Sequence, residues 1–436
     1  MKKRIRKTIT ILSPILLLVS SVMLCLLGAE IAYRYHLYSR MKNQPTYWVA
    51  SDSIYEYHRE LGYTHIPAKS VIEMKVDKGY PVLWNERFTD ESGNMTRVKQ
   101  DNGRKKYRIL VLGDSFTAYQ RDGSTWPDLL QDKLDARFPS KYDVVNCGRN
   151  MYGILQMFDL AAVKVKELQP DLVVVAFITD DLKRCRFWMT VDATQGVKRV
   201  IKAMSPPEVA GPARSMDSFL VHPSVTKPWC ESMMKSTRAD DPFLQAISDQ
   251  YRSIIMEGRY RDVFFTGSTS FVYNRIVHGD AFHGVFSHLR EPSLKEDAYR
   301  SDSRFRNRIA SMNASQVPYL LVHLPTYGDL RDGKYVLNSS ERELLNSLGQ
   351  LTDSNVINLL DYTPGSGEPI ETLYLLPHDS HPSRRGLEFL ADSVFNLLLR
   401  EGLATQGSRS GDLAAAHRSG NRNPAFAFSV EANALK

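Results

Sequence analysis

The chain has 436 residues, 43% hydrophobic and 24% charged, so it is long enough for one large domain with insertions or for two domains. The formal net charge is +7, but the first seven residues carry five of the basic groups. The remainder is almost balanced, which argues against nucleic acid as a partner.

A basic leader, 1–7, is followed by an uncharged stretch from Thr8 to Ala29. Its length suits one crossing of a bilayer, which takes about 20 residues, and the basic leader is expected to stay in the cytoplasm. A cleaved signal peptide is the alternative, but Leu27 stands where a small residue should precede cleavage after Ala29. We predict an uncleaved signal anchor in the inner (plasma) membrane, with 8–29 spanning it and the rest periplasmic or extracytoplasmic.

Residues 30–105 are interpreted as a membrane-proximal segment of short strands and turns. From 106 to 400, apolar runs alternate with helical patterns, which predicts an α/β fold with a parallel sheet and helices on both faces. The apolar runs are Ile109–Leu112, Val144–Val145, Leu172–Ile178, Tyr319–Leu324 and Val356–Leu360, and the helical patterns are Trp126–Phe138, Ile154–Leu168, Phe305–Asn313, Ser340–Leu351 and Ser383–Arg400.

The alternation is interrupted at about 190–300, which we interpret as an insertion that forms a cap or lid. The histidines of this segment show no metal-ligand spacing; they are His222, His278, His283 and His288. The chain has no Cys-x-x-Cys and no glycine-rich phosphate loop, so we predict neither metal nor cofactor. Residues 401–436 are polar and lack apolar periodicity, which predicts a disordered tail.

The first apolar run of the sheet ends at Gly113, and Asp114 and Ser115 follow at once. Open α/β sheets bind ligands at the carboxyl ends of their strands. Ser115 is therefore expected on a tight turn between strand and helix, which suits a nucleophile. The alternative is a serine that only caps the turn.

A second polar group lies near the other end of the chain, where His381 follows Asp379 by two residues. In an extended loop such residues point to the same side, so Asp379 can orient one ring nitrogen of His381 while the other faces Ser115. Nucleophile, base and orienting acid are the parts of a serine hydrolase. The alternative is that His381 caps a helix and Asp379 pairs with Arg384 or Arg385.

Four blocks, in this order, resemble the SGNH (GDSL-type) hydrolase family, in particular its membrane-anchored bacterial members, over residues 30–400. The blocks are Gly113–Thr117, Asn146–Gly153, Ala176–Leu182 and His381–Gly386. The resemblance implies a flavodoxin-like three-layer sandwich, Ser115 as nucleophile and His381 as base. It further implies an oxyanion hole at Ser115 and at positions 151 and 180.

Three departures from the family pattern bear on catalysis. The family has glycine where this chain has Met151, although a methionine still offers its backbone N–H. It has asparagine where this chain has Asp180, and a carboxylate accepts hydrogen bonds unless it is protonated. Its acid stands three residues before the histidine, at His378 here, with Asp379 one step nearer. Loss of one oxyanion donor typically costs about 2.7–4 kcal/mol of barrier.

These departures leave alternatives open. Either Asp180 is protonated, or Thr179 or a residue of the cap replaces the amide, or catalysis is weakened. The site acts with Asp379 as a triad, or without it as a Ser–His dyad.

We predict a serine esterase or acyl hydrolase, such as an O-deacetylase, whose substrate is an acylated envelope carbohydrate or lipid. An O-acyltransferase of envelope polysaccharides and a non-catalytic envelope protein are the alternative functions.

Overall fold

The computed structural model describes thirteen stretches of the chain. They are 2–42, 46–77, 80–96, 106–184, 186, 188–194, 197–203, 218–221, 298–331, 334–335, 337–362, 370–376 and 379–401. Most of the predicted insertion, with its four histidines, and the predicted tail after residue 401 lie outside the described residues.

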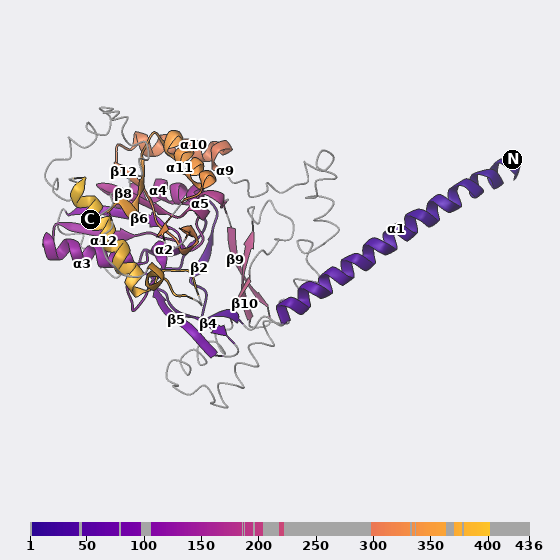
Figure 1. Cartoon of the computed structure of the whole chain (residues 1–436), viewed down its shortest axis with the longest axis horizontal. Helices are drawn as coiled ribbons and strands as arrows, with labels where there is room; N and C mark the ends of the chain where they lie inside the picture. Colours follow the sequence, from indigo (N-terminus) through magenta and orange to yellow (C-terminus); the bar gives the residue numbers. More distant parts are fainter. Residues whose placement is uncertain are drawn as a thin grey trace, which may run out of the picture.

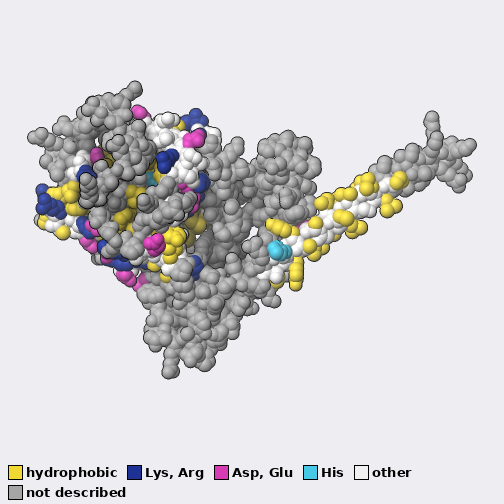
Figure 2. All heavy atoms as spheres, viewed as in Figure 1, with side chains coloured by type: hydrophobic (Ala, Val, Ile, Leu, Met, Phe, Trp, Pro, Cys, Tyr) yellow, Lys and Arg dark blue, Asp and Glu magenta, His cyan; other side chains and the backbone are white. Residues whose placement is uncertain are grey.

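The chain begins with one long helix, α1 (Lys2–Lys42), which projects from the rest of the molecule (Figure 1). Within the described residues it is the one helix that is long and apolar enough to cross a membrane, over the 21 residues Leu16–His36. Its hydrophobic side chains are exposed, as Figure 2 shows. This window lies further along the chain than 8–29 and includes Glu30 and Arg34, which form an ion pair.

A five-stranded parallel sheet forms the centre of the fold, with the strand order β15-β12-β8-β6-β7. The strands are β6 (Tyr107–Gly113), β7 (Tyr142–Asn146), β8 (Leu172–Phe177), β12 (Tyr319–His323) and β15 (Val356–Asn358). This is the flavodoxin-like order, which confirms the predicted fold class. The last strand is shorter than predicted, because a 3-10 helix, η4 (Leu359–Tyr362), begins after Asn358.

Helices cover both faces of this sheet (Figure 1). One face carries α3 (Trp126–Arg137) and α12 (Arg384–Arg400); the other carries α4 (Ile154–Leu168), α10 (Ser303–Ala314) and α11 (Ser339–Thr352). Thr125 caps α3 by accepting a hydrogen bond from the backbone N–H of Asp128. Ser383 caps α12 by accepting one from the backbone N–H of Gly386.

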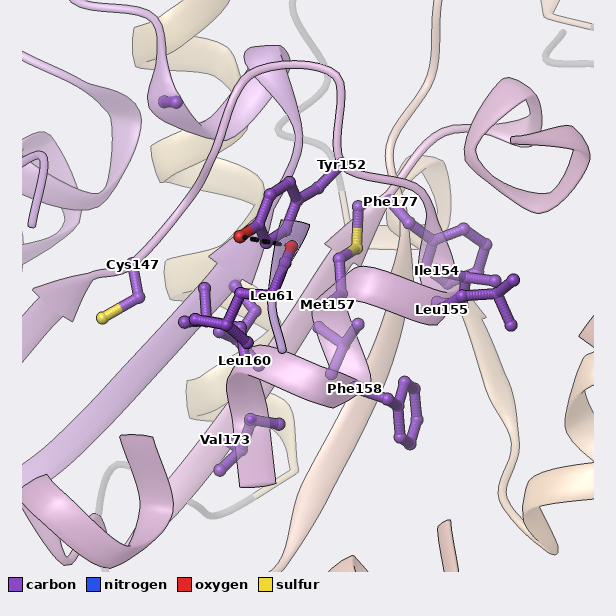
Figure 3. Packing of buried hydrophobic residues seen from close by; sticks show 14 of the residues in the cluster. Leu61, Cys147, Tyr152, Ile154, Leu155, Met157, Phe158, Leu160, Val173 and Phe177 are labelled. Carbon is purple, nitrogen blue, oxygen red and sulfur yellow. Dashed lines mark hydrogen bonds between the residues drawn. The ribbon is translucent and has the colours of Figure 1, made fainter. Parts of the chain in front are cut away.

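Alternating side chains of β6 divide the core into two layers. Ile109 and Val111 pack with the α3 and α12 side, and Leu110 and Leu112 with the α4 side. The loop before α4 contacts the segment that precedes the sheet, because the Tyr152 hydroxyl donates to the Leu61 carbonyl at 3.4 Å (Figure 3). Strands buried on both faces are expected for a parallel sheet.

Smaller sheets surround this core. An antiparallel sheet has the order β1-β4-β5, a second the order β11-β10-β9, and two hairpins are formed by β2-β3 and β13-β14. Their bounds are β1 (Thr46–Ala50), β2 (Tyr55–His58), β3 (Gly62–His65), β4 (Ser70–Asp77), β5 (Tyr80–Phe88), β9 (Trp188–Thr194), β10 (Val197–Ala203), β11 (Ser218–Val221), β13 (Leu330–Arg331) and β14 (Lys334–Tyr335). The remaining short helices are α2 (Ser115–Ala118), α5 (Thr179–Lys183), α9 (Ala298–Ser301), η3 (Tyr327–Asp329) and η5 (Ile370–Leu373).

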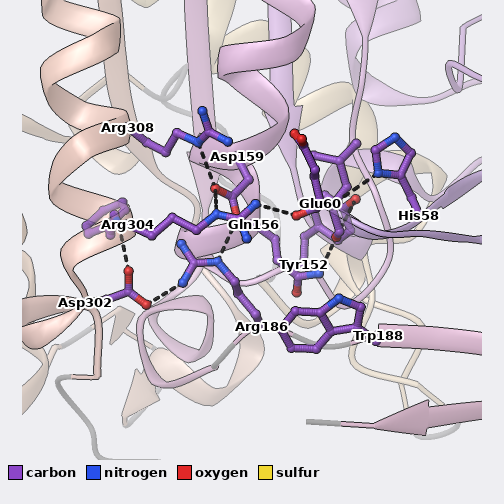
Figure 4. Close-up of polar contacts among 12 residues, drawn as sticks. His58, Glu60, Tyr152, Gln156, Asp159, Arg186, Trp188, Asp302, Arg304 and Arg308 are labelled. Carbon is purple, nitrogen blue, oxygen red and sulfur yellow. Dashed lines mark hydrogen bonds and ion pairs between the residues drawn. The ribbon is translucent and has the colours of Figure 1, made fainter. Parts of the chain in front are cut away.

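A buried carboxylate joins several of these elements (Figure 4). Asp159 of α4 is fully buried and pairs with Arg186 at 2.7 Å, with Arg304 at 3.0 Å and with Arg308 at 3.2 Å. Arg304 also donates to the carbonyl of Glu60, in the turn between β2 and β3. The cluster therefore connects α4, α10, the approach to β9 and the hairpin of the N-terminal segment.

Candidate active site

Ser115 follows a turn in which position 113 has room only for glycine. Gly113 ends β6, and a Cβ atom there would lie 2.2 Å from the Thr117 hydroxyl and 2.6 Å from the Ala176 carbonyl oxygen. Asp114 then caps α2 by accepting a hydrogen bond from the Phe116 backbone at 2.8 Å. Ser115 is the first residue of α2 and is 8% exposed. Its backbone N–H belongs to a first helical turn, where amides have no partner within the helix.

The structure brings the predicted nucleophile and base together. His381 Nε2 lies 2.8 Å from Ser115 Oγ, and His381 Nδ1 lies 2.8 Å from Asp379 Oδ1. With its proton on Nδ1, the ring donates to Asp379 and accepts from the Ser115 hydroxyl, which is the tautomer that a general base requires. Arg384 and Arg385 both pair with Glu388 instead of Asp379, at 3.3 and 3.1 Å.

The loop before α12 fixes the spacing of acid and histidine. Asp379 N–H donates to the Leu375 carbonyl at 2.9 Å, and Leu375 N–H donates to the His381 carbonyl at 3.1 Å. Backbone hydrogen bonds within the loop thus fix the positions of Asp379 and His381. His378 lies outside the described residues. In the described part of the loop, Asp379 is the acid that contacts the histidine.

The hydrogen bonds of Asp379 determine its ionisation. Burial acts to raise the pKa of this carboxyl, but the ring and backbone N–H groups of His381 and its charge outweigh burial. The net result is a pKa below the ordinary value. Asp379 is therefore ionised at neutral pH, as an orienting acid must be.

Aromatic rings hold the imidazole from the side. Tyr119 stacks on His381 with the ring centroids 4.8 Å apart and the planes 16° apart, and Phe116 lies 5.4 Å from it. The Arg121 guanidinium lies 4.0 Å from the Tyr119 ring centroid. Sequence reasoning missed Tyr119, because an aromatic residue just after a short helix resembles any other core residue.

Two of the predicted oxyanion positions lie beside this group. Met151 has a φ of 62°, in the left-handed region that favours glycine, as the resemblance to a glycine position implies. The carbonyl of the preceding Asn150 accepts a hydrogen bond from the Tyr63 hydroxyl. Ser115 and Met151 both line the same cavity. The hydrogen bond at Asn150 thus fixes the loop that carries the Met151 backbone N–H.

The third predicted position, Asp180, has a carboxylate side chain in place of an amide. Asp180 lines the cavity, but its side chain is 67% exposed and lies 3.6 Å from Lys183. Thr179, a proposed substitute, is buried, and its hydroxyl lies 3.0 Å from His323 Nε2. The Thr179 hydroxyl is therefore already engaged away from the nucleophile.

A cavity of about 520 Å³ opens at Ser115 and His381. Part of its lining comes from the N-terminal segment, in which sequence reasoning found no catalytic pattern. The contributing residues are Ala50, Asp52, Ser53, Ile54, Tyr55 and Glu73. They are spread over 24 residues of chain and reach the cavity only through tertiary packing, so no local pattern marks them.

Arg87 attaches this segment to the oxyanion loop. Its side chain is fully buried and donates to Glu73 at 2.7 Å, to the Tyr55 hydroxyl at 3.2 Å and to Asn150 Oδ1 at 3.0 Å. Burial alone would lower the pKa of Arg87, but the charge of Glu73 and the contact with Tyr55 raise it. The guanidinium therefore stays charged and holds one wall of the cavity against the loop that carries Met151.

Within the described residues, no group of three His, Cys, Asp or Glu side chains is arranged to hold a metal ion. Of the cysteines, Cys147 is buried and free, and burial raises the pKa of its thiol to about 11. Cys185 and Cys230 lie outside the described residues. The chemistry available in the described site is that of a hydroxyl, an imidazole and a carboxylate.

Part of the chain is similar to a known protein family. Residues 109–206 match the model of the GDSL-like lipase/acylhydrolase family. No match was found among curated proteins. The matched range contains Ser115, Met151 and Asp180, and ends before the His381 loop.

Several solved structures are similar at low identity. A structure titled TesA has 12% identity, covers 67% of this chain and 97% of its own, and has a TM-score of 0.31. A putative lipolytic protein of the G-D-S-L family from Desulfitobacterium hafniense DCB-2 has 13% identity, 67% and 100% coverage, and a TM-score of 0.28. The psychrotrophic esterase EstA from Pseudoalteromonas sp. has 13% identity, 68% and 99% coverage, and a TM-score of 0.32. These TM-scores are too low to carry an argument.

The matched residues form the first three strands of a flavodoxin-like parallel sheet, and they carry the serine at the carboxyl end of the first strand. The match of residues 109–206 to the GDSL-like lipase/acylhydrolase family therefore supports an ester hydrolase in general.

Proposed function

We propose that the protein is a serine esterase in which Ser115, His381 and Asp379 act as nucleophile, base and orienting acid. The observation that carries the proposal is the chain of two 2.8 Å contacts from Ser115 Oγ through the His381 ring to Asp379 Oδ1. A general base must lie within hydrogen-bond reach of the proton that it removes, and His381 does.

The reaction has two steps. His381 Nε2 takes the Ser115 proton while Oγ bonds to the ester carbonyl carbon, and the carbonyl π electrons move onto oxygen. The backbone N–H groups of Ser115 and Met151 hold this oxyanion, which collapses, expelling the alcohol with the proton from His381. Water, deprotonated by His381, then attacks the acyl-serine, and the acid leaves as Ser115 regains its proton.

The lining of the cavity supports an acylated carbohydrate or lipid as substrate. Tyr55, Tyr119 and Tyr327 provide apolar faces, while Asp52 and Asp180 provide hydrogen-bond acceptors. A sugar ring requires both kinds of contact, because it has apolar faces and a rim of hydroxyl groups. An O-acetylated envelope glycan is the substrate class that we propose to test first.

The exposed apolar face of α1 supports a membrane anchor. Five basic residues in 2–7 precede the apolar window, and positive charge favours the cytoplasmic side. We propose a single-pass protein of the inner membrane with its catalytic domain on the periplasmic side. An acylated substrate of the envelope would then lie in the same compartment as Ser115.

The test is hydrolysis of a short aryl ester and of an O-acetylated oligosaccharide. Ser115→Ala and His381→Ala should abolish acid release. Ser393→Ala should retain it, because the Ser393 hydroxyl donates to the Phe389 carbonyl within α12 and does not line the cavity. If the wild type is no faster than Ser115→Ala on every ester, the protein is not an esterase. Acid release that gives way to a new ester when a sugar is added would identify an acyltransferase.

A further inference from the structure

We propose that the Arg184 guanidinium stabilises the oxyanion at Ser115, in place of the amide that the family resemblance expects at position 180. This inference rests on the proposed esterase function and concerns the same site. It assigns a catalytic role to a residue outside the four sequence blocks, because Arg184 follows the third block by two positions.

Arg184 and Ser115 both contact the same oxygen atom, Asp114 Oδ2. Arg184 Nη1 lies 3.1 Å from Asp114 Oδ2, and Ser115 Oγ lies 3.4 Å from the same atom. Both residues line the cavity, and the Arg184 side chain is 25% exposed. Part of the guanidinium is thus presented to the space that an ester on Ser115 would occupy.

Two buried carboxylates hold the guanidinium in this place. Arg184 Nη1 also lies 2.7 Å from Asp181 Oδ1, and the side chains of Asp114 and Asp181 are fully buried. Burial acts to lower the pKa of Arg184, but pairing with Asp181 and Asp114 outweighs it and raises the pKa. Burial and the charge of Asp114 in turn raise the pKa of Asp181, so Asp114 is the acid that we take as the ionised partner. Arg184 therefore carries its positive charge throughout catalysis.

The main chain of Arg184 packs against the oxyanion loop. A Cβ atom at Gly153 would lie 2.7 Å from the Arg184 Cβ and 2.9 Å from its carbonyl oxygen. Gly153 caps α4 and follows Met151 by two residues. The glycine thus lets Arg184 approach the loop that carries the proposed Met151 donor, so the two donors belong to one packed unit.

The cavity is lined by more acidic than basic side chains, so the positive charge of Arg184 matters for an oxyanion that forms there. Among the described lining residues, Arg184 is the one permanent cation, and the acids are Asp52, Glu73, Asp180 and Asp379. A negative charge that develops at Ser115 is repelled by Asp180 and attracted by Arg184. Preorganised charge of this kind is worth more in a partly buried site than in water.

Arg184 has a second effect, on the Ser115 hydroxyl. That hydroxyl has two acceptors in reach, His381 Nε2 at 2.8 Å and Asp114 Oδ2 at 3.4 Å. Because Arg184 donates to the same Asp114 oxygen, it weakens this carboxylate as a competitor for the serine proton. The hydroxyl is left directed at the base.

The experiment measures kcat and KM for an aryl ester in Arg184→Gln, alone and combined with Asp180→Asn. Removal of one oxyanion donor lowers kcat by about 10²-fold or more, so we expect a loss of that size in Arg184→Gln with little change in KM. Asp180→Asn introduces an amide, so the double variant should recover at least part of the loss. Arg342→Gln, on α11 away from the cavity, is the matched control and should behave as wild type.

Each outcome decides the question. An unchanged kcat in Arg184→Gln contradicts the inference while the esterase function stands. An equal loss in both backgrounds, with a lower melting temperature, shows that Arg184 only balances Asp114 and Asp181. Arg184→Lys keeps the charge and should retain more activity than Arg184→Gln even if both are less stable. A wild type that does not exceed Ser115→Ala removes the proposed function and this inference together.

Discussion

Whether the site is a Ser–His–Asp triad or a Ser–His dyad depends on Asp379. Its Oδ1 atom lies 2.8 Å from His381 Nδ1 and also accepts the His381 backbone N–H at 3.3 Å. Both contacts disappear if the carboxylate is lost, so the ring loses the partner that sets its tautomer. The position one residue nearer to the histidine than in the family pattern is thus compatible with contact, because the backbone of the loop turns at Leu375.

We therefore predict that Asp379→Asn lowers kcat on the order of 10⁴-fold, the size of the effect when a triad acid becomes an amide. The physical reason is that an amide N–H facing Nδ1 stabilises the wrong tautomer. Asp392→Asn, which removes a half-buried carboxylate paired with Lys133 on α3, is the matched control. Near-wild-type kcat in Asp379→Asn would show that the site is a Ser–His dyad.

The same residue makes folding stability depend on pH. Because the pKa of Asp379 is lower in the folded protein than in the unfolded chain, its stabilising contribution is complete above the unfolded value of about 3.9 and is lost as pH falls through the folded value. We predict that below about pH 4 the free energy of unfolding falls less steeply in Asp379→Asn than in wild type. Denaturant titrations over pH 2–6 measure the two slopes, and parallel curves would contradict the assignment.

Among the elements, α4 is the one that joins the site to the rest of the fold. Its first residue follows Gly153, which contacts Arg184, and its Asp159 pairs with three arginines from other segments. Asp159 is fully buried, whereas the arginine side chains are 11–36% exposed. The carboxylate is therefore the member whose loss leaves the most charge without a partner.

We predict that Asp159→Asn destabilises the protein by about 3–5 kcal/mol, because removing one partner of a buried ion pair leaves uncompensated charge. Equilibrium denaturation measures this free energy of unfolding. Glu343→Gln, whose side chain is 74% exposed at its pair with Arg300, is the control and should change stability by less than about 1 kcal/mol. A change in Asp159→Asn as small as that in the control would show that the cluster does not stabilise the fold.

For the molecule as a whole, α1 is the helix that would anchor the protein in a membrane. Leu18 and Leu24 are 66% and 68% exposed near the middle of the helix, so nothing in the described protein covers them. A charged residue at the centre of a spanning helix costs about 2.5–3.5 kcal/mol for insertion. The apolar surface of α1 is therefore explained if lipid surrounds it.

We predict that the full chain stays in the membrane pellet after an alkaline wash, and that Leu18→Arg combined with Leu24→Arg shifts it to the supernatant. Fractionation followed by immunoblotting measures the distribution. Replacement of the same two leucines by alanine is the control and should leave the chain in the pellet. Extraction of the wild type by alkali would contradict a spanning helix.

Regular patterns were enough to predict the central fold. The apolar runs at Ile109–Leu112 and Leu172–Ile178 became β6 and β8, because strands buried on both faces need continuous apolar sequence. The run at Val356–Leu360 was too long by two residues. There the Asn358 side chain accepts the Leu360 N–H at 3.2 Å and the chain turns into η4.

Contacts between distant segments could not be predicted in the same way. For example, Arg87 forms a buried ion pair with Glu73 and a hydrogen bond with Asn150. No repeating pattern in the sequence marks residues that pair in this way. Arg184 stands between Lys183 and Arg186 in the sequence, and only the fold distinguishes it from them by pairing it with Asp114. The predicted roles of Ser115 and His381 did have a signal, since family blocks at fixed places in the strand order mark both residues.

The role of Ser115 as nucleophile is tested most directly by a fluorophosphonate probe and peptide mass spectrometry. We predict one adduct, on the peptide that contains Ser115, formed much more slowly in His381→Ala and absent in Ser115→Ala. No adduct on the wild type under any condition, or an adduct on another serine while Ser115 stays unmodified, would contradict it.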